Sequence, residues 1–82
     1  MESREEVLEA LISRVAAVFG KDVSEISEDT RFKEDLGAKS TQITQITVHM
    51  EDLIDAEVPY MQFNRKATVG EAADYLFSLC EG

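Results

Sequence analysis

Apolar residues recur every three or four positions in the first quarter of the chain. The members of this stripe are Val7, Leu8, Leu11, Ile12, Val15, Val18 and Phe19. Such spacing is typical of a helix with one buried face. Ser3 and Glu6 have the spacing of a capping box, and Gly20 is typical of a helix end. The pattern therefore predicts a helix from Ser3 to Gly20, with Arg14 on its solvent-exposed side.

The periodicity stops at Lys21 and does not return before Ala38. Acidic and small polar residues dominate this stretch, and its isolated apolar residues are Val23, Ile26, Phe32 and Leu36. So long a loop is unusual in a small domain unless separate contacts hold it in place. We therefore expect these four side chains to anchor the loop on a helical core.

A second helical pattern runs from Ser40 to Ile54. At about 100° per residue, its apolar positions fall on one stripe, formed by Ile43, Ile46, Met50, Leu53 and Ile54. The opposite side carries polar residues, namely Gln42, Gln45, His49 and Asp52. The stripe predicts a core-facing helix, and His49 is expected to face solvent because no second metal ligand follows it at helical spacing.

Two shorter patterns complete the chain. Pro59 suits the start of a short helical segment that reaches about Arg65 and carries the bulky residues Tyr60, Met61 and Phe63. Thr68 and Glu71 then have the spacing of a second capping box, before an inner face of Val69, Ala72, Ala73, Leu76 and Phe77. Residues 1–82 are predicted to form a single all-α domain: a four-helix bundle of three main helices and a short third helix, with a long loop between the first two.

The charge of the chain limits its partners. Seventeen acidic and eight basic residues give a net charge of −9, which repels nucleic acid and anionic lipid and favours basic protein surfaces. A merely soluble acidic surface is the alternative interpretation. No apolar run approaches the length of a membrane span, and the lone Cys80 is expected to be a buried or half-buried structural residue. We expect a cytoplasmic monomer that inserts into no membrane.

Motifs for catalysis and metal binding are lacking. The sequence has no paired glycines of a nucleotide site, no zinc-ligand spacing, no nucleophile elbow and one histidine. A calcium loop starting at Asp22 would need a glycine at its sixth position and a glutamate at its twelfth, where Lys33 stands. We therefore predict neither an enzyme nor a metal site.

Ser40 is the remaining candidate for chemistry. The run EDLGAKS brings it to the start of a predicted helix just after Gly37, a residue that permits unusual backbone angles. Helix N-termini favour phosphate because their amides are unpaired and carry partial positive charge. Ser40 is thus either a site for a phosphodiester or a plain helix N-cap.

Three motifs in order carry a family resemblance. RFKEDLGAKS at 31–40, EDLIDAEVP at 51–59 and TVGEAADYL at 68–76 resemble an acyl carrier protein, in register without gaps from about Thr30 to Leu79. The resemblance implies a four-helix bundle that is not itself an enzyme. It also implies that a separate phosphopantetheinyl transferase attaches the 4′-phosphopantetheine of coenzyme A to Ser40. Acyl groups would ride on this arm as thioesters and be presented to acyl-transferring or acyl-modifying enzymes.

The same resemblance assigns two further sets of residues. Those expected to border an acyl pocket are Ile46, Met50, Val58, Phe63 and Leu76. Those expected to meet partner proteins are Lys39, Thr41, Thr44, Val48, Glu51 and Asp52. Val48 could equally be a single exposed apolar residue without a role.

Departures from the family pattern suggest a specialised carrier. The family usually reads Asp-Ser-Leu at its modification site, where this chain reads Lys39-Ser40-Thr41. Lys39 can pair with an attached phosphate, but it should repel a transferase with a basic surface. Polar residues also replace the usual acidic or apolar ones at Gln42, Gln45, Thr44, Thr47 and Lys66. We expect a dedicated fatty-acid, lipid or polyketide-type pathway and a small or polar acyl group; the alternative is an interaction module that kept the fold and lost the arm.

Overall fold

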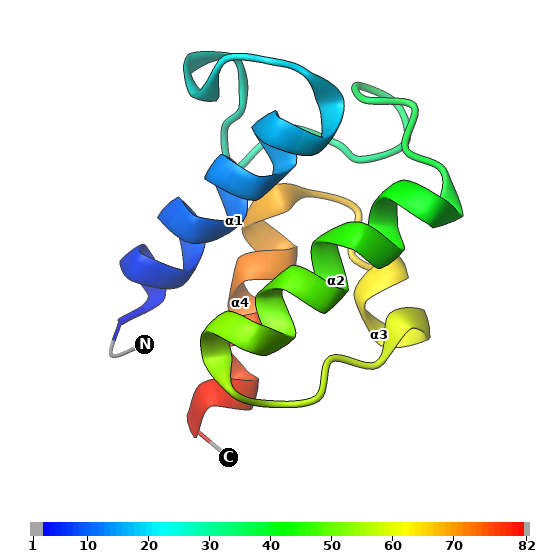
Figure 1. Ribbon diagram of the computed structural model, residues 1–82. Coiled ribbons are helices and arrows are strands. Elements are labelled where there is room, and N and C mark those ends of the chain that lie inside the picture. Colours follow the sequence, from blue (N-terminus) through cyan, green and yellow to red (C-terminus); the bar gives the residue numbers. More distant parts are fainter. Residues whose placement is uncertain (1–2, 82) are drawn as a thin grey trace.

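The computed structural model describes residues 3–81, and the elements in this range are helical. They are α1 (Arg4–Phe19), a short 3-10 helix η1 (Val23–Glu25), α2 (Ser40–Ile54), α3 (Tyr60–Asn64) and α4 (Val69–Glu81). Figure 1 shows α2 crossing the bundle diagonally, with α1 on one side, α3 on the other and α4 behind. The predicted four-helix bundle with a short third helix and a long first loop is confirmed.

Local capping chemistry sets the ends of α1. The Ser3 hydroxyl accepts from the Glu6 amide at 3.2 Å, and the Glu6 carboxylate accepts from the Ser3 amide at 3.2 Å. Gly20 ends the helix in the left-handed conformation, with φ of 64°. This capping box and this terminating glycine are those that the sequence predicts, because both depend only on neighbouring residues.

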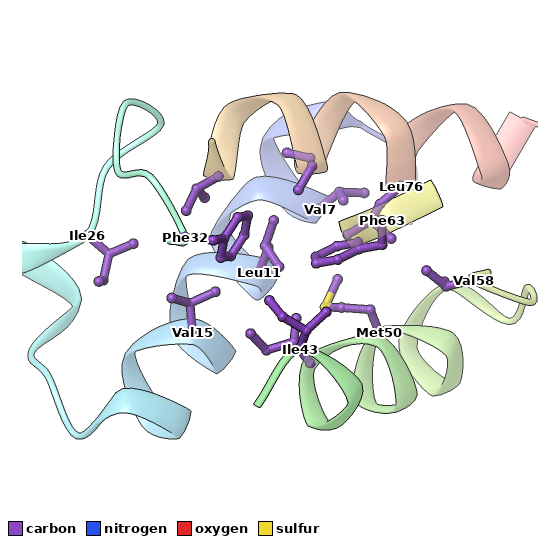
Figure 2. Close-up of a cluster of buried hydrophobic side chains, with 14 of the residues drawn as sticks. Val7, Leu11, Val15, Ile26, Phe32, Ile43, Met50, Val58, Phe63 and Leu76 are labelled. Atoms are coloured by element: carbon purple, nitrogen blue, oxygen red, sulfur yellow. The ribbon is translucent and has the colours of Figure 1, made fainter. Parts of the chain in front are cut away.

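All four helices and the long loop contribute to one core (Figure 2). Its fully buried large side chains are Phe63, Leu11, Ile46, Met50, Leu76, Val7, Val15 and Val69. Phe32 enters from the loop and lies against Phe63 of α3, with ring centroids 5.7 Å apart and a tilted geometry. The contact fastens the irregular loop to the short helix α3.

The long loop is also held by the start of α4. The Val69 amide donates to the Thr30 carbonyl at 3.0 Å, and the Gly70 amide donates to the Glu28 carbonyl at 2.9 Å. These are first-turn amides that have no partner inside their own helix. Arg4 reinforces the junction, since its guanidinium bonds the carboxylates of Glu28 and Asp74 and the Gly70 carbonyl. The two carboxylates raise the pKa of Arg4 above its usual range.

The loop anchors follow the prediction with one exception. Ile26 and Phe32 are buried and Leu36 is partly buried, but Val23 is 54% exposed. Val23 opens η1, whose cap is the carboxylate of Asp22, and this turn lies on the surface. The anchoring role predicted for Val23 is therefore wrong, and the cap explains why the turn forms without it.

Where α1 and α2 meet, the burial of several side chains differs from the prediction. Leu53 is 41% exposed, whereas Thr47 is buried and donates its hydroxyl to the Thr44 carbonyl at 3.0 Å. Arg14 and His49, both expected in solvent, are half-buried instead. The apolar stripe of α2 is thus rotated toward Thr47, and the α1–α2 contact covers the two polar side chains.

The last two helices begin close to the predicted positions. Pro59 is the N-cap of α3 rather than its first residue. At α4 the Thr68 hydroxyl accepts from the Glu71 amide at 3.2 Å, but the Glu71 carboxylate bonds the amide of Ala67 instead of the capping residue. Within residues 3–81, no helix is both long and apolar enough to cross a membrane.

Candidate cofactor-attachment site and partner surface

The end of the long loop is folded against the core just before α2. The Ala38 amide donates to the carbonyl of the buried Phe32 at 2.9 Å, and the Gly37 amide donates to the Lys33 carbonyl at 3.1 Å. Gly37 has a φ of 60°, which disfavours residues with a side chain. These bonds fix where α2 starts, so the position of Ser40 is set by the core and not by a free loop.

Ser40 is the first residue of α2, and its side chain is exposed. The N-cap is Lys39, whose amide donates to the Gln42 side-chain oxygen at 2.9 Å. The alternative that Ser40 is a plain N-cap is therefore wrong. Its hydroxyl is reachable from solvent and does not serve to cap the helix.

The surroundings of Ser40 suit a phosphodiester. The first turn of α2 contains no acidic residue. A phosphate on Ser40 would lie at the positive end of the helix, within reach of its first amides and beside the cationic side chain of Lys39. The residues present thus fit a covalently attached phosphate group.

The residues expected to meet partners are mostly exposed along α2. Lys39 and Thr41 lie at its start, and Thr44, Val48 and Asp52 follow toward its end; all five are exposed. Thr44, Val48 and Asp52 line one hollow of the surface.

Glu51 differs from the other predicted partner residues. It is half-buried, and its carboxylate accepts from the Val58 amide at 2.7 Å. This bond ties the end of α2 to the segment before α3.

The five predicted acyl-pocket residues come together in the core. Their exposed fractions range from 0% for Ile46, Met50, Phe63 and Leu76 to 4% for Val58. Figure 2 shows Met50 of α2 pointing toward the ring of Phe63, with Leu76 of α4 on the far side. The structure therefore presents a packed core here, between α2, α3 and α4.

Sequence reasoning missed the contribution of α1 to the surface beside α2. Arg14 and His49 share a hollow with the small residues Ala10, Ser13 and Ala17 of α1. A signal was present in the sequence, because Ala10, Ser13, Arg14 and Ala17 follow helical spacing and leave little bulk on that side of α1.

Comparisons with known proteins agree with this geometry. The family described as "Phosphopantetheine attachment site" matches residues 9–76. The chain is 35% identical over 74 residues to the acyl carrier protein of Exiguobacterium sp. (strain ATCC BAA-1283 / AT1b), covering 90% of this chain and 94% of that protein.

A solved structure gives the same result for the fold. The acyl carrier protein from Enterococcus faecalis superimposes with a TM-score of 0.77 at 27% identity, over 94% of this chain and 98% of the other. The chain therefore belongs to the acyl carrier protein family: it is a carrier with covalently attached 4′-phosphopantetheine as its cofactor, and not an enzyme.

Proposed function

We propose that Ser40 is the residue that bears the 4′-phosphopantetheine arm. The observation that carries this proposal is the exposed hydroxyl at the first position of α2, held there by the backbone bonds of Gly37 and Ala38. The Ser40 oxygen would lose its proton and attack the pantetheine-bearing phosphate of coenzyme A, which breaks the pyrophosphate bond and releases adenosine 3′,5′-bisphosphate. Lys39 and the first amides of α2 would stabilise the charge of the resulting phosphodiester. The bound arm supplies a thiol, on which acyl groups are held as thioesters.

The partners of the carrier follow from its family and its charge. Members of the family interact with a phosphopantetheinyl transferase and with enzymes that handle acyl groups. For this chain the exposed set from Lys39 to Asp52 is the proposed docking surface, with Glu51 acting mainly through its bond to Val58. The net charge of −9 opposes self-association and supports a monomer.

We assign this carrier to a specialised pathway rather than to general fatty acid synthesis. The first turn of α2 lacks acids, and Lys39 adds a positive charge beside the acceptor serine. A partner that reads an acidic helix start would bind this one weakly. A dedicated set of enzymes for a fatty-acid, lipid or polyketide-type product fits these charges better.

The acyl group is proposed to enter the core between α2, α3 and α4. It would have to displace packed side chains, and Thr47 places a hydroxyl group among the buried residues of α2. A hydroxyl whose only bond is to a nearby carbonyl retains acceptor capacity. A short or partly polar acyl group therefore fits this core better than a long alkyl chain.

The proposal is tested by mass spectrometry of the intact protein. After co-expression with a broad-specificity phosphopantetheinyl transferase, the mass should rise by one phosphopantetheine, and Ser40→Ala should abolish the rise. Ser13→Ala removes another exposed helical hydroxyl and should leave modification unchanged. If several transferases leave the wild-type chain unmodified, the proposal gives way to an interaction module without the arm.

A further inference from the structure

Phe32 connects the segment that leads to Ser40 with α3 and with the linker that follows α3. Its carbonyl accepts from the Ala38 amide at 2.9 Å, two residues before Ser40. Its amide donates to the Ala67 carbonyl at 3.1 Å, in the linker between α3 and α4. Its side chain is buried and lies against Phe63 of α3. The position of the Ser40 segment is therefore tied to α3 through Phe32.

Phe32 is the most deeply buried of the residues that hold this segment. The neighbouring backbone bond, from the Gly37 amide to the Lys33 carbonyl, ends on an exposed residue. Leu36 and Ala38 pack against the core but are only partly buried, whereas Phe32 is 3% exposed. The start of α2 thus depends on Phe32 more than on its other anchors.

The short helix α3 is the part of the proposed acyl pocket that can move most easily. It has five residues, whereas α2 has fifteen and α4 has thirteen. A helix this short is unstable in isolation, so contacts with the rest of the protein keep it in place. Among its described residues only Phe63 is buried. The ring contact between Phe63 and Phe32, with centroids 5.7 Å apart, is therefore a main attachment of α3 to the long loop.

An acyl group that enters the core between α2, α3 and α4 has to move the Phe63 ring. The ring is fully buried, and Met50 of α2 points toward it (Figure 2). A close-packed interior has no room for an added chain unless side chains shift. A Phe63 ring that shifts loses its attraction to the ring of Phe32.

We propose that Phe32 is a positioning residue that couples the filling of the acyl pocket to the segment before Ser40. In the empty carrier, the Phe63 ring holds Phe32, and Phe32 holds Ala38. An acyl group long enough to displace the ring releases Phe32, so the Ala38 bond opens more often and Ser40 becomes more mobile. Enzymes that take up the acyl group would then meet a looser attachment segment on a loaded carrier than on an empty one. The proposal rests on the proposed function, in which Ser40 bears the arm and the acyl group enters the core.

The first test needs no arm. Phe63→Leu in the unmodified full-length chain removes the ring contact and keeps an apolar side chain in the core. Hydrogen exchange of the Ala38 amide, followed by NMR, should become about fivefold faster, because a tilted aromatic pair contributes stabilisation of that order. Phe32→Leu should have a similar effect, and the double variant should exchange no faster than Phe32→Leu alone.

Leu76→Val is the matched control for loss of stability. It shortens another fully buried side chain of the pocket, on α4, and should leave Ala38 exchange unchanged. The coupling is wrong if Ala38 exchange is unchanged in Phe63→Leu, if it rises equally in Leu76→Val, or if the effects of Phe32→Leu and Phe63→Leu simply add.

The second test uses the wild-type carrier with an acetyl or an octanoyl group on its arm. Octanoyl should shift the ring signals of Phe63 and speed Ala38 exchange about fivefold, for the same aromatic contact is lost. Acetyl is too short to displace the ring and should do neither. In Phe32→Leu, octanoyl should still shift the Phe63 signals but should no longer change Ala38 exchange. The wild-type comparison stands even where a phenylalanine variant fails to fold.

The two tests separate failure of this proposal from failure of the proposed function. If octanoyl shifts the Phe63 signals of the wild type and Ala38 exchange does not change, the coupling is overturned and the acyl pocket stands. If octanoyl leaves the Phe63 signals in place, the proposed acyl pocket is overturned, and the unmodified variants alone decide whether Phe63 holds Ala38 through Phe32.

Discussion

Lys39 places a positive charge next to Ser40, the proposed attachment site. It is exposed, and the first turn of α2 has no acidic residue to balance it. A phosphate attached to Ser40 would gain from this cation, but a basic enzyme surface approaching Ser40 would be repelled. Lys39 would thus stabilise the attached phosphate but weaken the encounter with the transferase that attaches it.

Reversing this charge should speed modification by a transferase with a basic docking surface. We expect Lys39→Asp to raise kcat/KM of that transferase about fivefold at low salt, because an exposed charge pair contributes up to about 1 kcal/mol. The gain should shrink as salt is added, since exposed charges are screened. Rates of phosphopantetheine transfer from coenzyme A, measured at two ionic strengths, provide the check.

Lys33→Asp is the matched control for Lys39. It makes the same change of charge in the same loop, at an exposed residue seven positions before Ser40. Its effect should be smaller than that of Lys39→Asp. Equal gains for the two variants would mean that the change in net charge alone explains the faster rate. An unchanged rate for Lys39→Asp would contradict a local repulsion between Lys39 and the transferase.

The junction between the long loop and α4 shows how an element is fixed by backbone contact. Gly70 lies in the first turn of α4, and a Cβ atom built there would meet the Cβ, the Oε1 and the backbone oxygen of Glu28 at 3.1, 3.1 and 3.2 Å. The Glu28 oxygen cannot retreat freely because it accepts the Gly70 amide at 2.9 Å. A Cβ atom at residue 70 would therefore be crowded by Glu28, which favours glycine at this position.

Gly70→Ala should therefore destabilise the protein, against the usual trend in helices. Alanine in a helix is normally favoured over glycine by about 1 kcal/mol. We expect overpacking to outweigh this and to lower the free energy of unfolding by about 1 kcal/mol. Urea denaturation measures the change. Ser13→Ala, at an exposed helical position, is the control, and its free energy of unfolding should rise by a few tenths of a kcal/mol. A Gly70→Ala protein at least as stable as the wild type would contradict the prediction, because the loop at Glu28 would then have moved to make room for the methyl group.

The bounds of the helices could be predicted closely from the sequence. Which residues lie at the edges of their buried faces could not. The bounds of α2 follow from the pattern alone, because spacing and the end of the loop mark them locally. Whether Leu53 or Thr47 is buried depends on how α1 packs across α2, which no local pattern contains. Arg14 and His49 were misplaced for the same reason.

The same distinction between local and long-range features applies to the candidate site. The exposed place of Ser40 at the start of α2 follows from a glycine-bearing loop and a helical pattern, both local features. The bond from the Val58 amide to Glu51 does not, because it depends on the path of the chain after α2. That path turns at Asp55, whose φ of 54° is rare for a residue with a side chain and gives no clear sequence signal.

At the scale of the whole molecule, functional features lie on different sides of one small core. The exposed Ser40 lies where the long loop meets α2, the hollow beside α1 is lined by His49 and Leu53 of α2, and the proposed acyl pocket lies in the core between α2, α3 and α4. The three share α2 as a common element. An acyl group bound in the core is therefore expected to shift residues on the surface of α2, because a packed interior transmits small displacements.

The proposed acyl pocket predicts that an acyl group will fill a cavity made by mutation only where that cavity lies next to the pocket. Met50→Val and Leu11→Val each shorten a fully buried side chain, the first between α2 and α3 and the second on α1. Each should lower the free energy of unfolding by about 1 to 2 kcal/mol in the unacylated carrier. Loading the arm with an octanoyl group should restore about 1 kcal/mol of this loss in Met50→Val, because the chain fills the new space, and should restore nothing in Leu11→Val. Urea unfolding of the thiol and octanoyl forms measures both differences; equal recovery in the two variants, or none in Met50→Val, would place the acyl group outside this part of the core.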